Sequence, residues 1–370
     1  MGTDSWSECA TILRCPMSGG SLSLLSAEEL CSTNQAIANG KLVHADGSPI
    51  AMKLTQSAWG SEDRRYVYRL EDGISSLLPA LAIVRAEDAH LSGLNTNRQM
   101  VQKFYDEYGW LKNSAGFYND TSQFTDVRST SQDYDSACNS RIGKQLRGGT
   151  YLLDAASGSI PHASYLKFSK DYKFRVCLDF SIQALREAQR KLGDRGLYVL
   201  GDMANLPLSS ESIDDAISLH TLYHVPAEDQ ATAVAELVRV VSPGGRVVIV
   251  SKWDTSLLMV WMLRVRRPFG AIKRAMLRRN GVVAPTAGTS EARPIYYAPQ
   301  SYRWFVENVR DRHHAKLRLW SSTSTAFHEK YFSDSPAGRL MARLVLATES
   351  ALEPLAARFG EYPMFVIPKT

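Results

Sequence analysis

The sequence predicts an α/β protein in which a small β-rich module precedes a doubly wound, mostly parallel sheet. Two observations support this prediction. From Thr150 onward, short apolar segments alternate with amphipathic helical segments, a pattern typical of a parallel sheet covered on both faces. Before residue 95, strand-like segments at 41–44, 50–54 and 65–70 are separated by turn signals such as the D-G-S-P and E-D-G runs.

Five apolar segments are predicted to form the parallel strands of the sheet. They are residues 151–155, 173–178, Gly196–Leu200, Ile213–Leu219 and 246–250. Apolar residues at helical spacing lie between several of them, at 182–191 and 227–241. Right-handed crossovers between such strands give a doubly wound domain, whose ligand lies outside the carboxyl ends of the strands.

Length and composition exclude several classes of protein. The chain has 370 residues, of which 44% are hydrophobic and 22% charged, as in globular proteins with room for two domains. The longest apolar run, 257–263, is far shorter than the roughly 20 residues of a transmembrane helix. The N-terminus lacks the pattern of a secretory signal. Five cysteines without C-x-x-C spacing indicate free thiols. We therefore expect a cytoplasmic protein with domains at 1–95 and 96–370.

Carboxylates end three successive predicted strands. Asp154 leads into a loop of small residues that includes Ser157 and Gly158, and Asp179 and Asp202 end the next two strands. Small residues let a ligand approach the backbone, and the amide groups of a following helix attract anions. A carboxylate at the position of Asp179 can accept hydrogen bonds from ribose hydroxyls, and Asp202 could face an adenine amino group. The G-x-G-x-x-G loop of dinucleotide-binding domains is absent.

This order of motifs resembles the class I S-adenosylmethionine (SAM)-dependent methyltransferases, in particular the type 11 group. The loop after Asp154 is similar to their L-D-x-G-x-G-x-G motif in a reduced form, and D-F-S, G-D and S-P-G-G are similar to three later motifs. The resemblance covers about residues 97–370. It implies a seven-stranded sheet that ends in an antiparallel hairpin, which we expect at 315–320 and 364–367. It also implies insertions at 253–314 and 321–362 that form a helical lid over the acceptor.

The same resemblance implies SAM as the cofactor and no metal. A helix predicted at 98–110, which includes Phe104 and Tyr108, is expected to close over the cofactor. The residues implied to bind SAM are Asp154, Ala155, Ser157, Gly158, Asp179, Phe180, Asp202, Met203, Leu219 and Tyr105.

Two histidines directly after the fourth predicted strand are the candidate catalytic residues. A neutral imidazole there could take the acceptor's proton at neutral pH. We favour His224 as the base and expect His220 beside the methionine part of SAM. The alternative is that both only pack, because methyl transfer to a good nucleophile can rest on proximity and alignment alone.

Residues 10–86 resemble the small zinc-ribbon protein that activates tRNA and protein methyltransferases. They contain L-R-C-P-M-S where that family has L-x-C-P-x-C, and D-G-I followed by L-L-P as in its second motif. Cys15 remains, but Ser18 replaces the second cysteine, and the other knuckle offers only His44 and Asp46. One thiolate cannot complete a tetrahedral zinc site. We therefore expect a degenerate, metal-free module packed against the larger domain.

The expected function is transfer of a methyl group from SAM to O, N or C of a small hydrophobic acceptor in biosynthesis. Two alternatives stay open: an RNA methyltransferase of the ribosomal guanine type, which also has an N-terminal zinc ribbon, and a non-catalytic SAM-binding scaffold. Residues 255–279 carry seven Lys or Arg and no acid, a pattern that permits peripheral membrane contact. No RNA-recognition signature accompanies them, which argues against nucleic acid. The oligomeric state is not defined by the sequence.

Overall fold

The computed structural model describes residues 6, 10–90, 101–111, 119, 126, 128–258 and 296–370. Most of the predicted insertion at 253–314 and of the basic segment at 255–279 lies outside these residues. Among the described helices, none is both long and apolar enough to cross a lipid bilayer.

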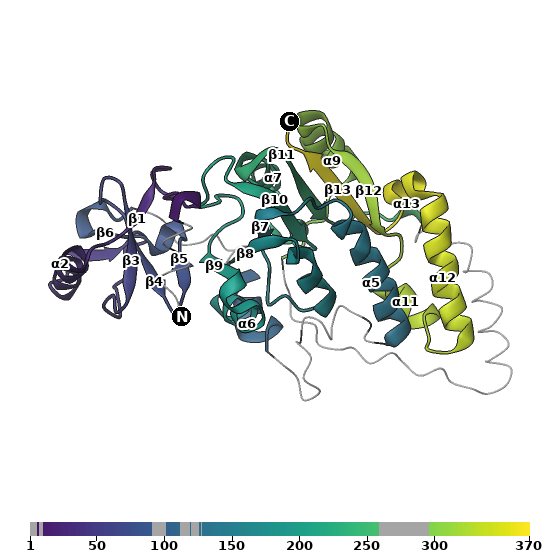
Figure 1. Ribbon diagram of the computed structural model, residues 1–370, viewed down its shortest axis with the longest axis horizontal. Coiled ribbons are helices and arrows are strands. Elements are labelled where there is room, and N and C mark those ends of the chain that lie inside the picture. The colour runs from purple at the N-terminus through teal and green to yellow at the C-terminus, as the bar shows by residue number, and fades with distance from the viewer. Residues whose placement is uncertain are drawn as a thin grey trace.

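The larger domain is built on a seven-stranded sheet of order β9-β8-β7-β10-β11-β13-β12 (Figure 1). Strands β7 to β11 are mutually parallel, and β13 is antiparallel to both β11 and β12. The predicted doubly wound sheet and its terminal hairpin are therefore confirmed. The strands are β7 (Gly149–Ala155), β8 (Tyr172–Asp179), β9 (Gly196–Leu200), β10 (Ile213–Leu219), β11 (Val241–Val250), β12 (Lys316–Ser321) and β13 (Tyr362–Pro368).

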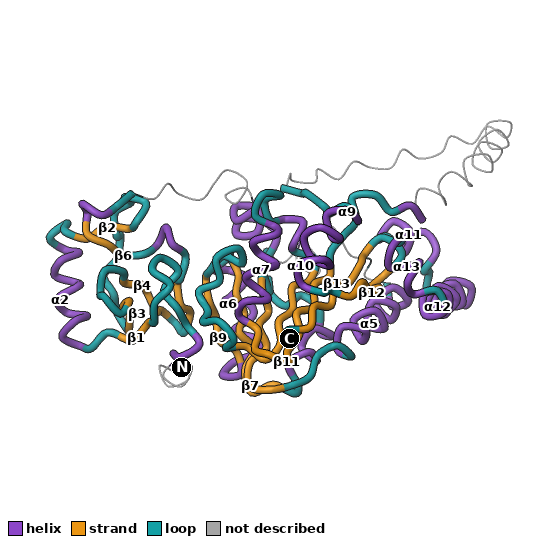
Figure 2. Tube along the Cα trace, turned by 90° about the horizontal axis from the view of Figure 1, so that it is seen from above, coloured by secondary structure: helices purple, strands orange, loops and turns teal. Residues whose placement is uncertain are grey.

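Helices cover both faces of this sheet, because residues of its strands alternate between two apolar clusters. Ala216 of β10 belongs to the cluster under α7, and Ile217 belongs to the cluster under α5 and α6. Figure 2 shows α5 and α9 on opposite sides of the strands. The helices are α5 (Ser129–Gly143), α6 (Ile182–Leu192), α7 (Gln230–Val240), α9 (Tyr302–Phe305), α10 (Asp311–His313), α11 (Thr325–Tyr331), α12 (Pro336–Ala351) and α13 (Glu353–Phe359).

Serine hydroxyls mark where several of these helices begin. Ser181, Ser324 and Ser335 each accept a hydrogen bond from a backbone N–H in the first turn of α6, α11 and α12. The helices within 321–362 confirm that this insertion is mainly helical. Helix α5 was not predicted, because its sequence is mostly polar and only Tyr134, Cys138 and Ile142 give its buried face an apolar signal.

The N-terminal module is β-rich as predicted, but two of its details differ from the expectation. The strand expected at 50–54 is wrong, since these residues form no strand and Leu54 is buried as part of a loop. A helix, α2, was missed although Ser26 and Glu29 form a capping box at its start. The elements are β1 (Leu22–Leu24), α2 (Ala27–Ala38), β2 (Leu42–His44), β3 (Ser57–Ser61), β4 (Val67–Glu71), β5 (Ile74–Ser76) and β6 (Ile83–Arg85).

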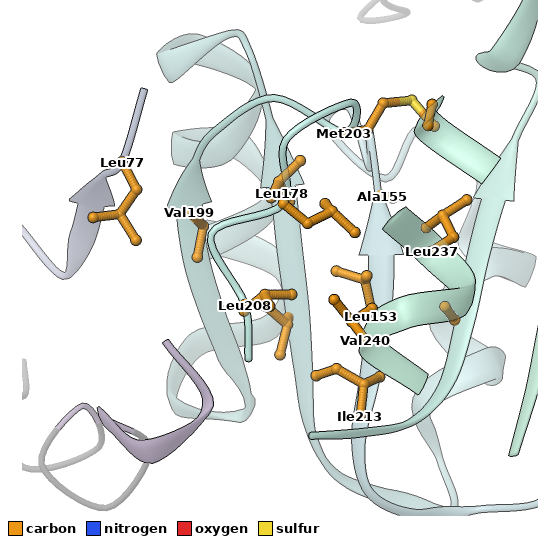
Figure 3. Close-up of a cluster of buried hydrophobic side chains, with 14 of the residues drawn as sticks. Leu77, Leu153, Ala155, Leu178, Val199, Met203, Leu208, Ile213, Leu237 and Val240 are labelled. Carbon is orange, nitrogen blue, oxygen red and sulfur yellow. The ribbon is translucent and has the colours of Figure 1, made fainter. Parts of the chain in front are cut away.

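The module and the larger domain share one continuous sheet. Strand β5 pairs in parallel with β9, and Ile74 lies opposite Tyr198. Beyond β5, the N–H of Leu77 donates to the carbonyl oxygen of Leu200 at 2.8 Å. The Leu77 side chain joins the buried cluster that contains Leu178 and Val199 (Figure 3). The module therefore covers an edge strand that would otherwise offer unpaired backbone groups.

The side chains at the positions of the expected zinc ligands do not lie together, and each makes its own hydrogen bonds. Cys15 Sγ lies 3.2 Å from Tyr68 Oη and accepts from the N–H of Ser18 at 3.4 Å. His44 Nδ1 instead bonds the carbonyl oxygen of Leu81. Among the described residues, no three metal-ligating side chains come together. That the module binds no zinc stays a prediction.

Candidate cofactor and acceptor site

Two adjoining cavities lie at the carboxyl ends of the parallel strands, where a doubly wound sheet holds its ligand. The smaller one is lined by residues that follow β7, β8, β9 and β10. The larger one has a volume of about 1350 Å³ and extends to α5, α11 and the terminal hairpin. Asp179, Phe180 and His224 line both, so the two cavities are parts of one site.

The predicted cofactor residues gather at these cavities, with one exception. Ala155 is fully buried in the core and lines neither cavity. Asp179 and Phe180 line both cavities, Asp202 and Met203 line the smaller one, and Asp154, Ser157, Gly158, Leu219 and Tyr105 line the larger one.

The loop after β7 keeps the backbone of a glycine-rich loop with only one glycine. Ala156, Gly158 and Ile160 have φ values of +58°, +54° and +54°. These are the three positions at which the L-D-x-G-x-G-x-G motif has glycine. A side chain with a Cβ atom costs about 1–2 kcal/mol in this left-handed region, and a β-branched one is a clear outlier. The strained backbone is thus concentrated where the site needs close approach.

Asp179 is held in place by two backbone amides. Its Oδ2 accepts from the N–H of Gly158 at 2.8 Å, and its Oδ1 accepts from the N–H of Ser181 at 2.9 Å. Burial raises the pKa of this carboxyl to about 6. Each oxygen has a further lone pair, so Asp179 can still accept hydrogen bonds from a ligand in either cavity.

Asp154 is engaged by a partner that the sequence analysis did not foresee. Arg175, in the middle of β8, donates from Nε at 3.1 Å and from Nη2 at 2.5 Å to Asp154 Oδ2. Both side chains are almost completely buried. The guanidinium also donates to the carbonyl oxygen of Tyr165 at 2.7 Å. Asp154 therefore borders the larger cavity as one half of a buried ion pair that fixes the start of the loop.

The predicted aromatic helix lies over this loop, and residues 101–110 of it are described. A Cβ atom placed on Gly158 would come within 2.5 Å of the Trp110 ring, so a larger residue would fit here only if the ring moved. Tyr105 stacks on Trp110 with ring centroids 5.1 Å apart. Ser181 Oγ donates to the Asp106 carboxylate, and a π-helical turn spans Tyr105–Gly109. Such turns are frequent at functional sites.

The two candidate histidines occupy different parts of the site. His224 Nδ1 is 2.8 Å from the carbonyl oxygen of Tyr296, so Nδ1 carries the hydrogen and Nε2 keeps a lone pair. Burial lowers the pKa of His224 to about 4 and that of His220 to about 3, so both are neutral at neutral pH. The His220 ring packs edge-to-face against Trp320 and Tyr362, at centroid distances of 4.4 and 5.4 Å.

The far wall of the larger cavity was missed by sequence reasoning. Trp320 is the penultimate residue of β12 and Tyr362 begins the antiparallel β13, so both lie at the same edge of the sheet as His220. Lys252 follows β11, and its Nζ lies 3.1 Å from Glu361 Oε1 and over the Tyr362 ring. A motif could not reveal these residues, because they come from distant segments. The only signal was their position at the ends of the predicted hairpin.

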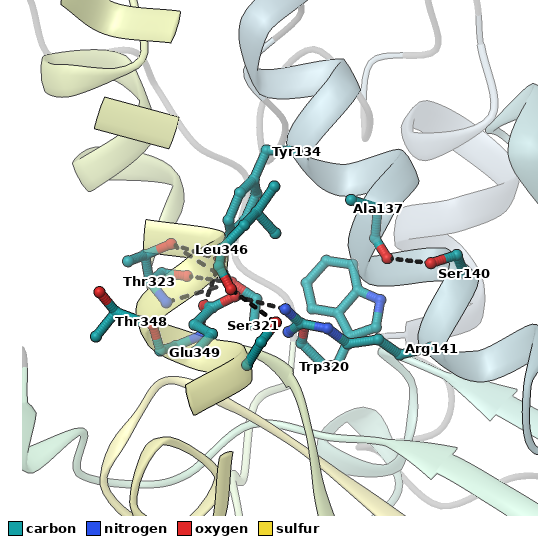
Figure 4. A network of polar contacts seen from close by, with 12 residues as sticks. Tyr134, Ala137, Ser140, Arg141, Trp320, Ser321, Thr323, Leu346, Thr348 and Glu349 are labelled. Atoms are coloured by element: carbon teal, nitrogen blue, oxygen red, sulfur yellow. Dashed lines mark hydrogen bonds and ion pairs between the residues drawn. The ribbon is translucent and has the colours of Figure 1, made fainter. Parts of the chain in front are cut away.

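A buried polar network anchors the insertion at 321–362 to the sheet (Figure 4). Tyr134 Oη donates to Glu349 Oε1 at 2.6 Å, and Arg141 Nη2 lies 2.8 Å from Glu349 Oε2. Thr323 Oγ1 connects Tyr134 Oη to His328 Nε2, at 3.2 and 2.9 Å. The network joins α5 to α11 and α12, and its outermost member, His328, lines the larger cavity.

Comparison with known proteins identifies the central part of this chain. A methyltransferase domain family matches residues 153–249. The tRNA (carboxymethyluridine(34)-5-O)-methyltransferase of Arabidopsis thaliana is 37% identical over 125 residues, which are 32% of this chain and 29% of that protein. The demethylmenaquinone methyltransferase of Beutenbergia cavernae is 29% identical over 166 residues, which are 45% of this chain and 60% of that protein. The chain thus spans between 29% and 60% of these two relatives.

Among solved structures, a complex between a methyltransferase activator of Haloferax volcanii and a methyltransferase is similar to this chain. It has a TM-score of 0.39 and 15% identity, over 65% of this chain and 91% of that chain. The family match itself runs from β7 to β11 and includes Asp154, Asp179, Asp202 and both histidines. Residues 153–249 of this chain therefore match a methyltransferase domain.

Proposed function

We propose that this protein transfers a methyl group from SAM to O, N or C of a small organic acceptor. The observation that carries the proposal is the continuity of the site. The smaller cavity contains the residues suited to a nucleoside, and it meets the larger, aromatic cavity at Asp179 and His224. A cavity of about 1350 Å³ is large enough for a cofactor together with a small acceptor.

The residues of the site fit SAM. When bound, SAM supplies an electrophilic methyl group on a sulfonium sulfur. Asp179 would accept hydrogen bonds from its ribose, and Asp202 would lie beside its adenine. Trp110 and Tyr105 would exclude water above the glycine loop. The acceptor atom would be aligned in the larger cavity, and the neutral Nε2 of His224 could take its proton.

The charge of the larger cavity favours a neutral or cationic acceptor over RNA. Asp154 and Asp126 are paired with arginines. Among the described residues of the lining, acids then outnumber lysines, namely Asp133, Asp135, Asp179 and Glu329 against Lys167 and Lys252. Burial raises the pKa of Asp135 to about 7. Asp135 is therefore only partly ionised at neutral pH, and the ionised acids of the lining repel phosphates, whereas RNA-binding surfaces are basic.

Calorimetric titration followed by a turnover assay tests the proposal. We expect SAM to bind, and S-adenosylhomocysteine to form when phenols, amines or a demethylated menaquinol are supplied. Methylation of total tRNA or ribosomal RNA, with no turnover of small acceptors, would support the RNA alternative instead. SAM binding without turnover of either acceptor class would support the scaffold alternative, and absence of SAM binding would contradict all three.

We further infer that the N-terminal module is a fused counterpart of the methyltransferase activator that it resembles. Its docking through β5 and the buried Leu77 supports this role. The thiols of Cys15, Cys138 and Cys177 are free and buried, which is consistent with the cytoplasmic location that we propose.

A further inference from the structure

We propose that the outer face of α12 and α13 docks this protein on a lipid bilayer that contains anionic lipids. Among the described residues, ten large hydrophobic side chains are exposed, and half of them lie on these two adjoining helices or at the single residue between them. We call this set the α12–α13 stripe: Leu340, Met341, Leu344, Leu352 and Leu355, which are 38 to 57% exposed. Monomeric proteins rarely expose contiguous apolar patches, so a stripe of this kind indicates a binding surface.

The outward direction of these side chains is fixed by the packing of α12. Gly338, Ala342 and Glu349 lie on the inner face of the helix and are buried. Glu349 accepts from Tyr134 of α5, so this face cannot rotate outward without breaking the buried network. Because a helix returns to the same face every three or four residues, Leu340 and Leu344 must then point away from the domain.

The charged residues beside the α12–α13 stripe are positive, and they favour an anionic partner. The exposed charged residues of α12 and α13 are Arg339, Arg343 and Arg358, and no exposed acid accompanies them. The acids of these helices are engaged, since Glu349 is buried and Glu353 pairs with Arg318. Leucines flanked by arginines are typical of helices that lie in the interface of an anionic membrane, because the arginine head groups reach the lipid phosphates.

Other occupants fit this surface less well. A second copy packed stripe against stripe would bring its own arginines against Arg339 and Arg343, and neither α12 nor α13 carries an exposed acid to neutralise them. The basic segment 255–279 of the same chain has the same problem, with seven Lys or Arg. Nucleic acid would match the charge but would leave the leucines without an apolar partner.

Docking of this face would bring the site close to lipid. Figure 1 shows α12 and α13 at the end of the molecule opposite the N-terminal module. Helix α11, which packs on α12, contributes His328 and Thr325 to the wall of the larger cavity. Docking through this surface does not depend on the proposed reaction.

Co-sedimentation of the full-length protein with vesicles tests the inference. We expect binding to vesicles of phosphatidylcholine with one third phosphatidylglycerol, and much weaker binding to pure phosphatidylcholine. The variant Leu340→Gln/Leu344→Gln should bind the anionic vesicles at least about tenfold more weakly, because each leucine loses its burial in the bilayer. Arg343→Gln should weaken binding about fivefold, and this effect should vanish at high salt.

The matched control is Met52→Gln, which changes an equally exposed side chain at the far end of the molecule and should bind as the unchanged protein does. Circular dichroism checks that each variant is folded. The inference is overturned if the unchanged protein does not bind anionic vesicles. It is likewise overturned if the double leucine variant binds these vesicles as strongly as the unchanged protein does. It is also overturned if sedimentation equilibrium shows a dimer that this variant dissociates, since the stripe would then bind a second copy.

Discussion

Asn205 Nδ2 donates a hydrogen bond to the carbonyl oxygen of Pro16 at 3.0 Å, across 189 positions of the chain. Asn205 also closes the turn that begins at Asp202, since its N–H donates to the Asp202 carbonyl oxygen at 3.1 Å. The turn lines the smaller cavity, whereas Pro16 belongs to the N-terminal module. The module therefore holds a loop of the candidate cofactor site directly.

The first prediction follows from this contact. Asn205→Ala removes the hydrogen bond to Pro16 and should loosen the turn at Asp202. We expect SAM to bind about fivefold more weakly as a result, because the loss of one hydrogen bond costs about 1 kcal/mol. Ser209→Ala is the control, because Ser209 also contacts the module, at Thr11 and Leu13, but lies outside the turn. Calorimetry that finds the same SAM affinity in both variants would refute the coupling.

The second prediction concerns removal of the module. A chain that starts at residue 96 would expose the β9 edge and the apolar surface that Ile74, Leu77 and Leu78 cover. We expect this fragment to aggregate, because an open edge strand recruits other strands. Size-exclusion chromatography and thermal unfolding measure the outcome. A monomeric fragment with unchanged melting temperature and SAM affinity would contradict the structural role of the module.

The third prediction uses the strained loop after β7. Ala156→Gly should raise the free energy of unfolding by about 0.5–1 kcal/mol, because glycine adopts a positive φ without strain and this gain exceeds its entropic cost. Ile160→Gly relieves similar strain but removes a buried side chain, so it should destabilise by about 2–4 kcal/mol. Denaturant unfolding compares the two, and a loss of stability in Ala156→Gly would show that the loop is not strained there.

The fourth prediction concerns pH and Asp179. The carboxylate form accepts hydrogen bonds from the ribose, and burial raises the pKa of this group to about 6. SAM affinity should therefore be constant above about pH 7 and fall by up to about tenfold per pH unit below 6, as the carboxyl becomes protonated.

Two substitutions check the assignment of this pH dependence to Asp179. Asp179→Asn should bind SAM more weakly than the unchanged protein above pH 6, and its affinity should lack the dependence below pH 6. Asp179→Ala should lose about 1.5–3 kcal/mol of binding free energy at neutral pH. A pH dependence that persists in Asp179→Asn would assign it to another group.

The fold was largely predictable because the parallel strands are continuous apolar runs with polar residues at their carboxyl ends. The position of the candidate cofactor residues was predictable for the same reason, since Asp179 ends β8 and Asp202 lies just beyond β9. That they bind SAM stays a prediction. The acceptor side was not predictable, because Trp320, Tyr362 and His328 meet only through the hairpin and the helices of the insertion. Arg175 also escaped prediction, because a buried arginine is recognisable only when its partner, Asp154, is known to lie beside it.

The pairing of β5 with β9 has a consequence for how the chain is made. The N-terminal module leaves the ribosome first, but the strand that completes its sheet follows more than one hundred residues later. At about 5–20 residues per second, the apolar side chains of Ile74 and Leu77 wait roughly 6–24 s for their partner strand. During synthesis the β5 edge of the module therefore stays unpaired until β9 has been made, an interval in which it could pair with other strands.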